Sequence, residues 1–457
     1  MSSAAQMLEI NQLREQIAGS VFTAEDAAYQ EARLAWNRAV DQYPALIIKA
    51  KNAQDVVAGI RFARQHGLGV SVQSTGHGLH IAANDALLIV MADMNAVTVD
   101  PAARTARVEG GAIWQDVLAV ATPLGLAPLL GSSPGVGVVG YTLGGGISWL
   151  ARKYGFAADS VRWIEVVTAD GELRRVSPTE NTDLFWAVRG GGGAFGAVTA
   201  LEFDLYPVPT VYGGNLIYPA ELASDVLHRY REWIDTVPDE LTSSVVVMKF
   251  PDLPFVPEPM RGLVQVFVRA VYTGDVAEGA ALLQSWVNWR APIANTFAEI
   301  PFSQIGTVSS DPEDPVSAYN SNETLTMLTD QAIEAILGAI IAEDSPFFMM
   351  DMRHGQGALQ HKKTNPSALS NRDTKIYLQM GGAAFSPEAY KRVQSAVQRL
   401  SANLRDSARG GYLNFMSGPE AKVRVQSVYP PETLARLQAI KREYDPENLF
   451  RFTFQFA

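Results

Sequence analysis

The stretch GSSPGVGVVGYTLGGGISW, residues 131–149, decides how the first half of this chain is interpreted. Glycine lets a backbone approach a ligand closely, and successive amide N–H groups in such loops form anion-binding nests. Two more glycine loops lie in the same strand-rich region, SVQSTGHGLH at 71–80 and GGGGAFG at 190–196. Together, the three loops predict a cradle for a pyrophosphate, although each loop alone is as well explained as a tight turn.

Known phosphate motifs do not explain these loops. A P-loop needs a lysine after its last glycine, and none follows here. Residues 135–140 formally match the dinucleotide motif GxGxxG, but Pro134 and a loop precede them where a buried strand should end. The match is therefore weak evidence for a nucleotide-binding α/β fold.

Composition narrows the class of protein. Of the 457 residues, 47% are hydrophobic and 19% charged, which is typical of a globular chain of two or three units. The net charge of −11 argues against a nucleic-acid surface. The chain has no cysteine, which excludes disulfides, a thiolate nucleophile and iron–sulfur clusters. No signal peptide or long apolar run is evident, so we expect a cytoplasmic protein without a membrane or nucleic-acid partner.

The hydrophobic pattern predicts an α+β architecture. In the first half we expect strands at 44–51, 69–74 and 85–94, helices at 52–67 and 112–125, hairpins at 96–111 and 161–177, and a long strand ending near 209. In the middle we expect an antiparallel sheet covered by helices on one face, with strands at 241–250, 263–274, 347–357 and 374–385 and helices at 220–237, 276–287, 329–343 and 387–404. The tail predicts a helix, a stop at Asp445-Pro446 and an aromatic strand.

Four motifs in this order resemble one enzyme family. They are SVQSTGHG, GSSPGVGVVGYTLGGGISWLARKYGFAADSV, DLFWAVRGGGGAFGAVTALEFDLYPVP and the terminal RLQAIKREYDPENLFRF. With them, the chain resembles the FAD-linked oxidases of the vanillyl-alcohol oxidase superfamily, in the berberine-bridge-enzyme-like branch. The resemblance implies a two-domain flavoprotein with an FAD-binding domain at 1–208 (its PCMH-type part at about 38–208), a substrate-binding domain at 209–408, and a segment at 409–457 that returns to the FAD domain.

The resemblance assigns a role to His77, which lies between two glycines. In this family the corresponding histidine is bonded covalently to the 8α-methyl of FAD. Many relatives form a second bond through a cysteine at the position of Ser133, so here only a single link is expected. Gln73 and Thr75 depart from the family, which usually has arginine and glycine at these positions. The alternative for His77 is a loop histidine that hydrogen-bonds to backbone.

The resemblance also implies the remaining cofactor contacts. Asn414 and Gln455 are equally consistent with surface polar residues. The residues expected to contact FAD are Gln73, Ser74, Thr75, Gly76, Gly78, Ser133, Val136, Gly137, Gly140, Tyr141, Gly144, Gly145, Gly146, Gly196, Val198, Asn414 and Gln455. No metal is expected.

The expected chemistry follows from the cofactor. Flavin accepts a hydride at N5 from an alcohol, amine or phenolic carbon, and reoxidation by O₂ gives H₂O₂. Tyr412 is the proposed base. Residues expected in the substrate pocket are Asp351, Arg353, His354 and Arg372, with Asn371 and His80 as further candidates, although these side chains could equally pair with one another or with solvent.

Three other functions remain open at this stage. A dehydrogenase of the same fold would not use O₂, a flavin-binding protein would show no turnover, and a glycine-rich carbohydrate-binding module would be colourless. The expected partners are a small-molecule substrate and O₂, with the chain as a monomer or homodimer.

Overall fold

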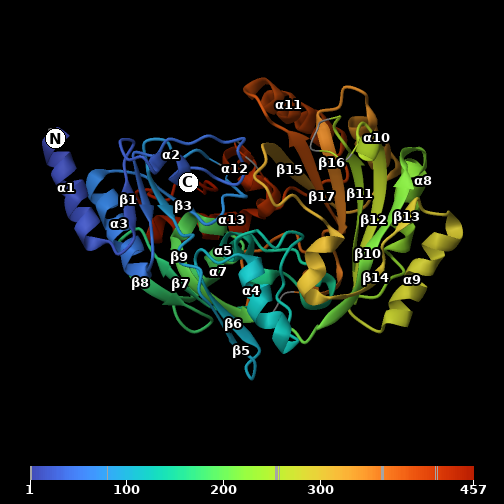
Figure 1. The fold of residues 1–457 in the computed structure, drawn as a ribbon, viewed down its shortest axis with the longest axis horizontal. Coiled ribbons are helices and arrows are strands. Elements are labelled where there is room, and N and C mark those ends of the chain that lie inside the picture. Colours follow the sequence, from blue (N-terminus) through green and yellow to red (C-terminus); the bar gives the residue numbers. More distant parts are fainter. Residues whose placement is uncertain are drawn as a thin grey trace.

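The computed structural model describes residues 3–79, 81–252, 256, 258–361, 365–416, 418 and 420–456. These residues form three β-sheets with helices packed on them (Figure 1). The sheets contain four, five and eight strands. The predicted α+β class is confirmed.

The four-stranded sheet ends at the first glycine loop. Its strand order is β1 (Ser20–Phe22), β2 (Leu46–Lys49), β4 (Leu87–Val90), β3 (Val70–Gln73), and the last three strands are parallel. Helix α3 (Ala53–His66) packs on it; the side chain of Asn52 caps its first turn, and Gly67 ends it at a left-handed φ of 68°. Strand β3 therefore delivers the chain into the loop immediately after Gln73.

The five-stranded sheet carries the other two glycine loops. Its order is β5 (Val97–Asp100), β6 (Thr105–Glu109), β9 (Ala197–Asp204), β7 (Val161–Val167), β8 (Leu173–Val176), all antiparallel. Both predicted hairpins are confirmed. Helices α4 (Trp114–Ala121), α5 (Val138–Leu143) and α7 (Thr182–Val188) share a hydrophobic core with this sheet.

The eight-stranded sheet forms the second half of the molecule. Its order is β13 (Ala294–Asn295), β10 (Thr210–Pro219), β12 (Val264–Tyr272), β11 (Leu241–Lys249), β16 (Phe347–His354), β17 (Ile376–Ala383), β15 (Ala318–Leu325), with β14 (Ala298–Pro301) also paired to β10. All its pairs are antiparallel, as predicted.

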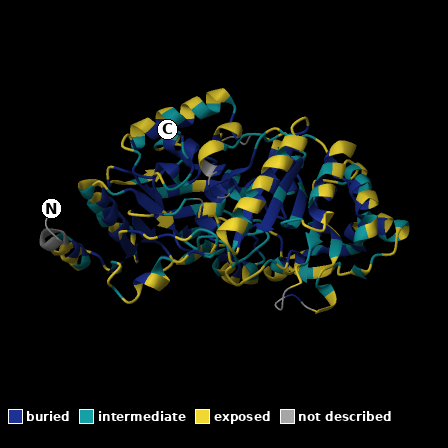
Figure 2. Ribbon diagram, turned by 90° about the horizontal axis from the view of Figure 1, so that it is seen from above, coloured by how far each residue is buried: buried dark blue, intermediate teal, exposed yellow. Residues whose placement is uncertain are grey.

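Four helices pack against this sheet: α8 (Ala223–Trp233), α9 (Val276–Trp289), α10 (Asp330–Ile341) and α11 (Pro387–Asn403). Their apolar residues share one core with the strand residues that point toward them. Figure 2 shows the helices with exposed residues on their outer faces and buried residues beneath. Within the described residues, none of the helices is long and apolar enough to cross a membrane.

The C-terminal segment returns to the first half of the chain. Helix α13 (Pro431–Tyr444) and the apolar residues Leu413, Val428 and Phe454 lie in the same core as Trp114. The predicted aromatic strand at the end is wrong: residues 445–456 contain no strand. The carboxylate of Asp445 accepts hydrogen bonds from the backbone N–H groups of Leu449 and Phe450, which holds the chain in turns while its aromatic side chains fill the core.

Candidate cofactor and substrate site

The first glycine loop is held against residues 35–37. Gly76 has a φ of +78°, and a Cβ there would lie 2.5 Å from the Cβ of Ala35, so both conformation and space require glycine. The N–H of Trp36 donates to the carbonyl of Thr75 at 2.9 Å, and the N–H of Asn37 donates to that of Gly76 at 3.3 Å. The loop therefore has a fixed backbone.

His77 is fixed within this loop by two contacts. Its ring stacks on the indole of Trp36 with centroids 4.0 Å apart and planes 16° apart. Its Nδ1 lies 2.8 Å from Oγ1 of Thr75. Burial lowers the pKa of His77 to about 4, so the imidazole is neutral at pH 7 and one ring nitrogen keeps its lone pair.

Gln73, at a position where the resemblance predicts arginine, stabilises the loop. Its Oε1 accepts a hydrogen bond from Nε2 of Gln42 at 2.9 Å, and its own Nε2 donates to the carbonyl of Leu34 at 2.9 Å. The side chain is buried. Because protein groups occupy both ends of the amide, this side chain supports the loop, and its contact with the cofactor stays a prediction.

The first and second glycine loops meet at Gly137. A Cβ on Gly137 would lie 2.7 Å from Oγ of Ser74, which itself donates to the carbonyl of Gly111 at 3.3 Å. By contrast, a Cβ on Gly140 would meet nothing within 4 Å, and Gly140 is exposed. The loops thus form a closed wall at Gly137 and leave open space beside Gly140, with Ser133 and Val136 half-buried near the junction.

The end of the second loop contacts the predicted base. The N–H of Gly146 donates to the hydroxyl of Tyr412 at 2.7 Å, and Nδ2 of Asn414 donates to the same hydroxyl at 3.1 Å and to the carbonyl of Tyr141 at 2.8 Å. A Cβ on Gly144 would lie 1.8 Å from Oδ1 of Asn414. Burial raises the pKa of Tyr412, so its phenol is protonated at pH 7.

The third glycine loop packs against the second. The N–H of Gly190 donates to the carbonyl of Leu143 at 2.8 Å. Gly196 is packed so closely that a Cβ would lie 2.6 Å from Cγ2 of Val166, and Val198 is buried in β9. Gln455 bonds only within the described tail, to the carbonyls of Arg451 and Thr453 at 2.6 and 3.0 Å and to Asn448 at 3.3 Å.

Strand β16 of the large sheet presents two of the predicted pocket residues to this region. Arg353 donates from Nε to Oδ2 of Asp351 at 2.8 Å and from Nη2 to Oε1 of Gln379 at 3.3 Å, and its guanidinium lies 4.9 Å from the ring centre of Phe415. Among the described residues, the buried Oδ1 of Asp351 has no hydrogen-bond partner. Met350 and Met352 point to the helix-covered core instead.

The structure separates His354 and Arg372 from this pair. Nε2 of His354 accepts from Nη1 of Arg152 at 2.7 Å, inside a buried contact between the two halves. Arg372 is ion-paired with the carboxylate of Asp159 at 2.6 Å. Because both side chains are engaged elsewhere, we no longer assign them to the pocket. Asn371 donates to the carbonyl of Val428 at 3.1 Å, and His80 lies outside the described residues.

The sequence interpretation missed Trp36 and Gln379. Trp36 carries the ring that supports His77, yet it lies in a short stretch without glycine or a charged motif, so nothing marked it. Gln379 sits in β17 directly across the sheet from Asp351. Only the register of the two strands brings it to Arg353.

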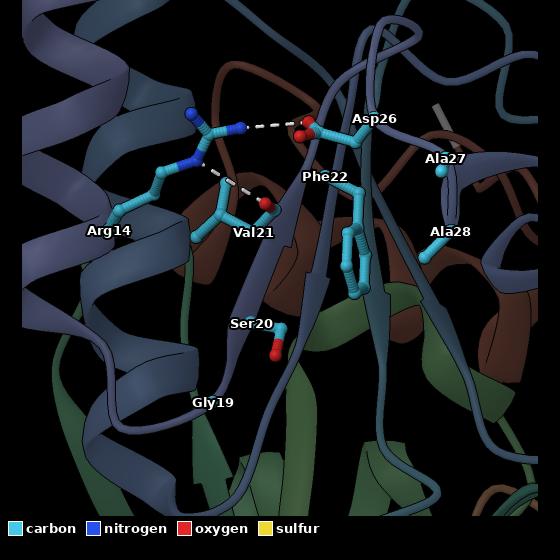
Figure 3. A pocket seen from close by; sticks show the side chains of 8 residues that line it. All are labelled: Arg14, Gly19, Ser20, Val21, Phe22, Asp26, Ala27 and Ala28. Carbon is cyan, nitrogen blue, oxygen red and sulfur yellow. Dashed lines mark hydrogen bonds and ion pairs between the residues drawn. The ribbon is translucent and has the colours of Figure 1, made fainter.

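A separate hollow lies between α1 (Ser3–Gln16) and β1 (Figure 3). Arg14 crosses it, with Nη2 bonded to Oδ2 of Asp26 at 2.8 Å and Nε bonded to the carbonyl of Val21 at 3.4 Å. None of the predicted cofactor or substrate residues lines it. We therefore place the functional site at the meeting of the glycine loops.

Comparison with known proteins identifies the class of this protein. Residues 44–177 match the family described as FAD binding domain, and residues 411–454 match the family described as berberine and berberine like. These matches span the first two glycine loops and the Tyr412 segment. The fold and site thus define an FAD-dependent oxidoreductase.

Individual relatives extend this result over the whole chain. The chain is 30% identical to (R)-6-hydroxynicotine oxidase of Paenarthrobacter nicotinovorans, over 96% of both chains. Its fold matches 6-hydroxy-D-nicotine oxidase from Arthrobacter nicotinovorans with a TM-score of 0.84 and 26% identity, covering 96% of this chain and 98% of that one. The protein belongs to the berberine-bridge-enzyme-like family of FAD-linked oxidoreductases.

A third relative is known for its flavin linkage. The structure of glucooligosaccharide oxidase from Acremonium strictum matches with a TM-score of 0.83 and 23% identity, covering 98% of this chain and 99% of that one. That protein is described as carrying a 6-S-cysteinyl, 8α-N1-histidyl FAD. At this identity the likeness shows the fold alone.

The residues present fit an FAD group. The open side of Gly140 leaves room for a ligand along the second loop, and the buried hydroxyl of Tyr141 has no hydrogen-bond partner among the described residues. The residues that would hold FAD are the loops at 74–78 and 133–146, with His77 at one end and Tyr141 at the other.

Proposed function

We propose that this protein is an oxidase that carries FAD covalently on His77 and oxidises an alcohol, amine or phenolic carbon of a small organic substrate. The observation that carries the proposal is the convergence of a neutral, stacked His77 with the second glycine loop, which in turn touches Tyr412. When bound, FAD supplies a hydride acceptor at N5, with O₂ as the final acceptor giving H₂O₂.

Tyr412 is the group that we assign to the substrate proton. Its oxygen accepts two N–H hydrogen bonds, from Gly146 and Asn414, which stabilise the deprotonated form, and the guanidinium of Arg353 acts in the same direction. Burial opposes all three and dominates, so the pKa of Tyr412 is raised well above its ordinary value and the protonated phenol is the resting form. Tyr412 thus holds and moves a proton at its phenolic oxygen.

Asp351 and Arg353 are the side chains that we assign to substrate orientation. They lie on the sheet face opposite the helix-covered core, and the ring of Phe415 lies against the guanidinium. The unpartnered Oδ1 of Asp351 can accept a hydrogen bond from a hydroxyl or ammonium group. This supports a substrate that carries a hydroxyl or ammonium donor. Relatives named as oxidases of 6-hydroxynicotine and of glucooligosaccharides support including both amines and sugars among the candidates.

Anaerobic mixing with a substrate panel tests the proposal. Alcohols, amines, phenols and small sugars are added to purified protein, and loss of the visible flavin absorbance is followed. Bleaching by one class, followed by recovery with one H₂O₂ per turnover in air, supports the oxidase. Bleaching that air does not reverse indicates the dehydrogenase alternative, and a flavin that no compound bleaches indicates a binding protein.

A further inference from the structure

Two arginines of the large sheet point to the face that the helices do not cover. Arg269 in β12 and Arg353 in β16 are each paired in register with Ser244 of β11, which stands between them. The chain neighbours of all three residues include members of the helix-covered core, and side chains alternate along a strand, so these three side chains share the opposite face. They form a row across three adjacent strands.

Arg269 is buried without an opposite charge in contact. The residue is 6% exposed. Its Nε donates to Oδ1 of Asn215 at 3.1 Å, and its Nη2 donates to the carbonyl of Ser309 at 3.2 Å. In the part of the chain that the structure describes, no carboxylate forms an ion pair with this guanidinium, and no hydrogen bond from its Nη1 is found. A buried cation with only neutral partners carries a desolvation cost that a bound anion would offset.

The nearby carboxylates do not replace such a partner. Burial lowers the pKa of Arg269, and the attraction of Asp351 and Asp311 offsets this only in part. Asp351 is bonded instead to Nε of Arg353 at 2.8 Å. Asp311 is half-buried and forms no ion pair with an arginine of the described ranges. Arg269, Arg353 and Asp351 together therefore carry one net positive charge on this face.

Two hydroxyls beside Arg269 lack partners. The buried Oγ of Ser244 forms no hydrogen bond with any residue that the structure describes. The same holds for the buried Oγ of Ser309, the residue whose carbonyl accepts from Arg269. Buried hydroxyls normally have a hydrogen-bond partner, so each of these marks a place for a ligand atom. A hydroxyl can donate to a carboxylate oxygen.

We propose that these groups bind a carboxylate of the substrate, with Arg269 as its main cationic partner. The inference rests on the proposed function and names a class of substrate for the same site. The two oxygens of a carboxylate lie in one plane and suit the fixed N–H groups of a guanidinium. One oxygen accepts from Nη1 of Arg269, and the other accepts from the hydroxyl of Ser244. The unpartnered Oδ1 of Asp351 stays available for the donor group of the substrate.

The position of this row relative to Tyr412 orients the substrate. Tyr412 lies beside β17, where its ring centre is 5.6 Å from that of Tyr377. Arg353 is paired with Tyr377, and Ser244 and then Arg269 follow on the next strands. Neighbouring strands lie about 4.8 Å apart, so Ser244 is roughly 10 Å across the sheet from Tyr377. The carboxylate end of the substrate therefore lies away from the carbon that is oxidised.

The test measures the binding of matched probes to the flavin-loaded protein by titration calorimetry. The pairs are benzoate with benzamide, phenylacetate with phenylacetamide, and 3-phenylpropionate with 3-phenylpropionamide. The members of a pair have nearly the same shape and differ in charge, and the three pairs place the charge at increasing distance from the ring. The variants are Arg269→Met, Arg269→Lys, which keeps the charge, and Ser244→Ala. Arg231→Met is the control, because Arg231 lies on α8, on the helix-covered side of the sheet.

We expect wild type and Arg231→Met to bind the carboxylate of at least one pair about tenfold more tightly than its amide, the effect of a hydrogen bond to a charged group. In Arg269→Met this preference should fall about tenfold, with partial recovery in Arg269→Lys. In Ser244→Ala it should fall roughly threefold to tenfold. Thermal unfolding checks that each variant is folded, and Ser244→Ala removes only one buried oxygen.

Equal affinity for both members of every pair, or no binding of any probe, overturns the carboxylate site. A preference that both Arg269→Met and Ser244→Ala retain also overturns it. These results leave the proposed oxidase intact, because bleaching of the flavin by the substrate panel is scored separately. A protein that prefers carboxylates but whose flavin no compound bleaches keeps the carboxylate site and loses the oxidase.

Discussion

The proposed cofactor side and the proposed substrate side of this site differ in the groups that line them. On the proposed cofactor side, the wall is glycine backbone, His77 is neutral, and the buried amide of Gln73 is uncharged. On the substrate side, β16 presents the buried ion pair of Asp351 and Arg353. The proposed cofactor side therefore consists mainly of backbone groups, whereas the proposed substrate side consists of side chains.

This difference explains how one scaffold accepts different substrates. Backbone N–H groups are present whatever the side chain. The proposed cofactor wall therefore depends only on a few positions where close packing or a left-handed backbone requires glycine. Side chains on a strand can change singly without altering the sheet register. On the proposed assignment, the cofactor side depends on backbone and substrate choice depends on the side chains of the sheet.

The largest effect is expected from replacing His77, which should abolish covalent attachment of the flavin. His77→Ala removes the nucleophile, so we expect no acid-stable flavin. Acid precipitation and intact mass measure this directly. His66→Ala serves as the control, because His66 lies at the end of α3 and should leave the covalent flavin intact. Full covalent retention in His77→Ala would contradict the assignment.

Breaking the ion pair tests the substrate side. Arg353→Met leaves the carboxylate of Asp351 buried and unpaired, which should lower the free energy of unfolding by about 3–5 kcal/mol. Denaturant unfolding measures the loss, and adding Asp351→Asn should recover part of it. Arg231→Met removes the cation from an exposed carboxylate, Asp330, and should lower the free energy of unfolding far less than Arg353→Met does. Equal losses in the two variants would show that burial does not matter here.

Tyr412 joins the two sides, so its hydroxyl should affect both stability and rate. Tyr412→Phe leaves the buried N–H of Gly146 without its acceptor, at a cost of about 1–3 kcal/mol. Tyr141→Phe, whose buried hydroxyl has no described partner, should change the unfolding free energy of flavin-free protein by under about 0.5 kcal/mol.

The same phenol predicts a pH profile. Its pKa is raised in the folded protein, so above about pH 10 the unfolded state loses its proton first and the contribution of Tyr412 to stability falls as pH rises. The rate of flavin reduction should increase with pH in the alkaline range, as the phenolate fraction grows. A flat profile in wild type, or an equally steep one in Tyr412→Phe, removes Tyr412 as the base.

Replacing Gly140 is expected to give the smallest change, and it separates the stability of the protein from its binding of the cofactor. Gly140→Ala fills open space within α5 and should stabilise the chain by about 0.5–1 kcal/mol while weakening flavin retention. Gly338→Ala, in α10 with equally open surroundings, should give the same gain without affecting flavin. Unchanged flavin retention in Gly140→Ala would move the cofactor away from this side of the loop.

Local chemistry made much of the first half predictable from sequence. The cap at Asn52, the stop at Gly67 and the two hairpins all act between near neighbours, and the strands and helix they delimit are present. The assembly of the first loop against Trp36 depends on contacts between segments far apart in the chain. Glycine content marked that loop as part of a predicted cradle, and only the motif resemblance assigned a role to His77.

Four strands of the large sheet were not predicted, namely β10, β13, β14 and β15. The two long ones, β10 and β15, were missed for different reasons. Strand β10 contains Gly213 and Gly214, which favour a turn in a sequence-based interpretation. Strand β15 is AYNSNETL, a polar stretch typical of a loop, yet it is largely buried. Its polar groups are satisfied by the C-terminal segment: Ser321 bonds to Glu420, and Asn322 bonds to the backbone of Tyr412. Hydrophobic periodicity along the sequence does not indicate contacts with segments far away in the chain.

The return of residues 411–456 to the core of the first part of the chain has a consequence for how the protein is made in the cell. The ribosome produces β9 long before it produces Leu413, Val428 and Phe454, which complete the core around Trp114. A growing chain therefore exposes an unfinished apolar surface while the strands of the eight-stranded sheet are being synthesised. Capture of the flavin must await this last segment, so chaperone protection during translation should matter more for the first-made half than for the second.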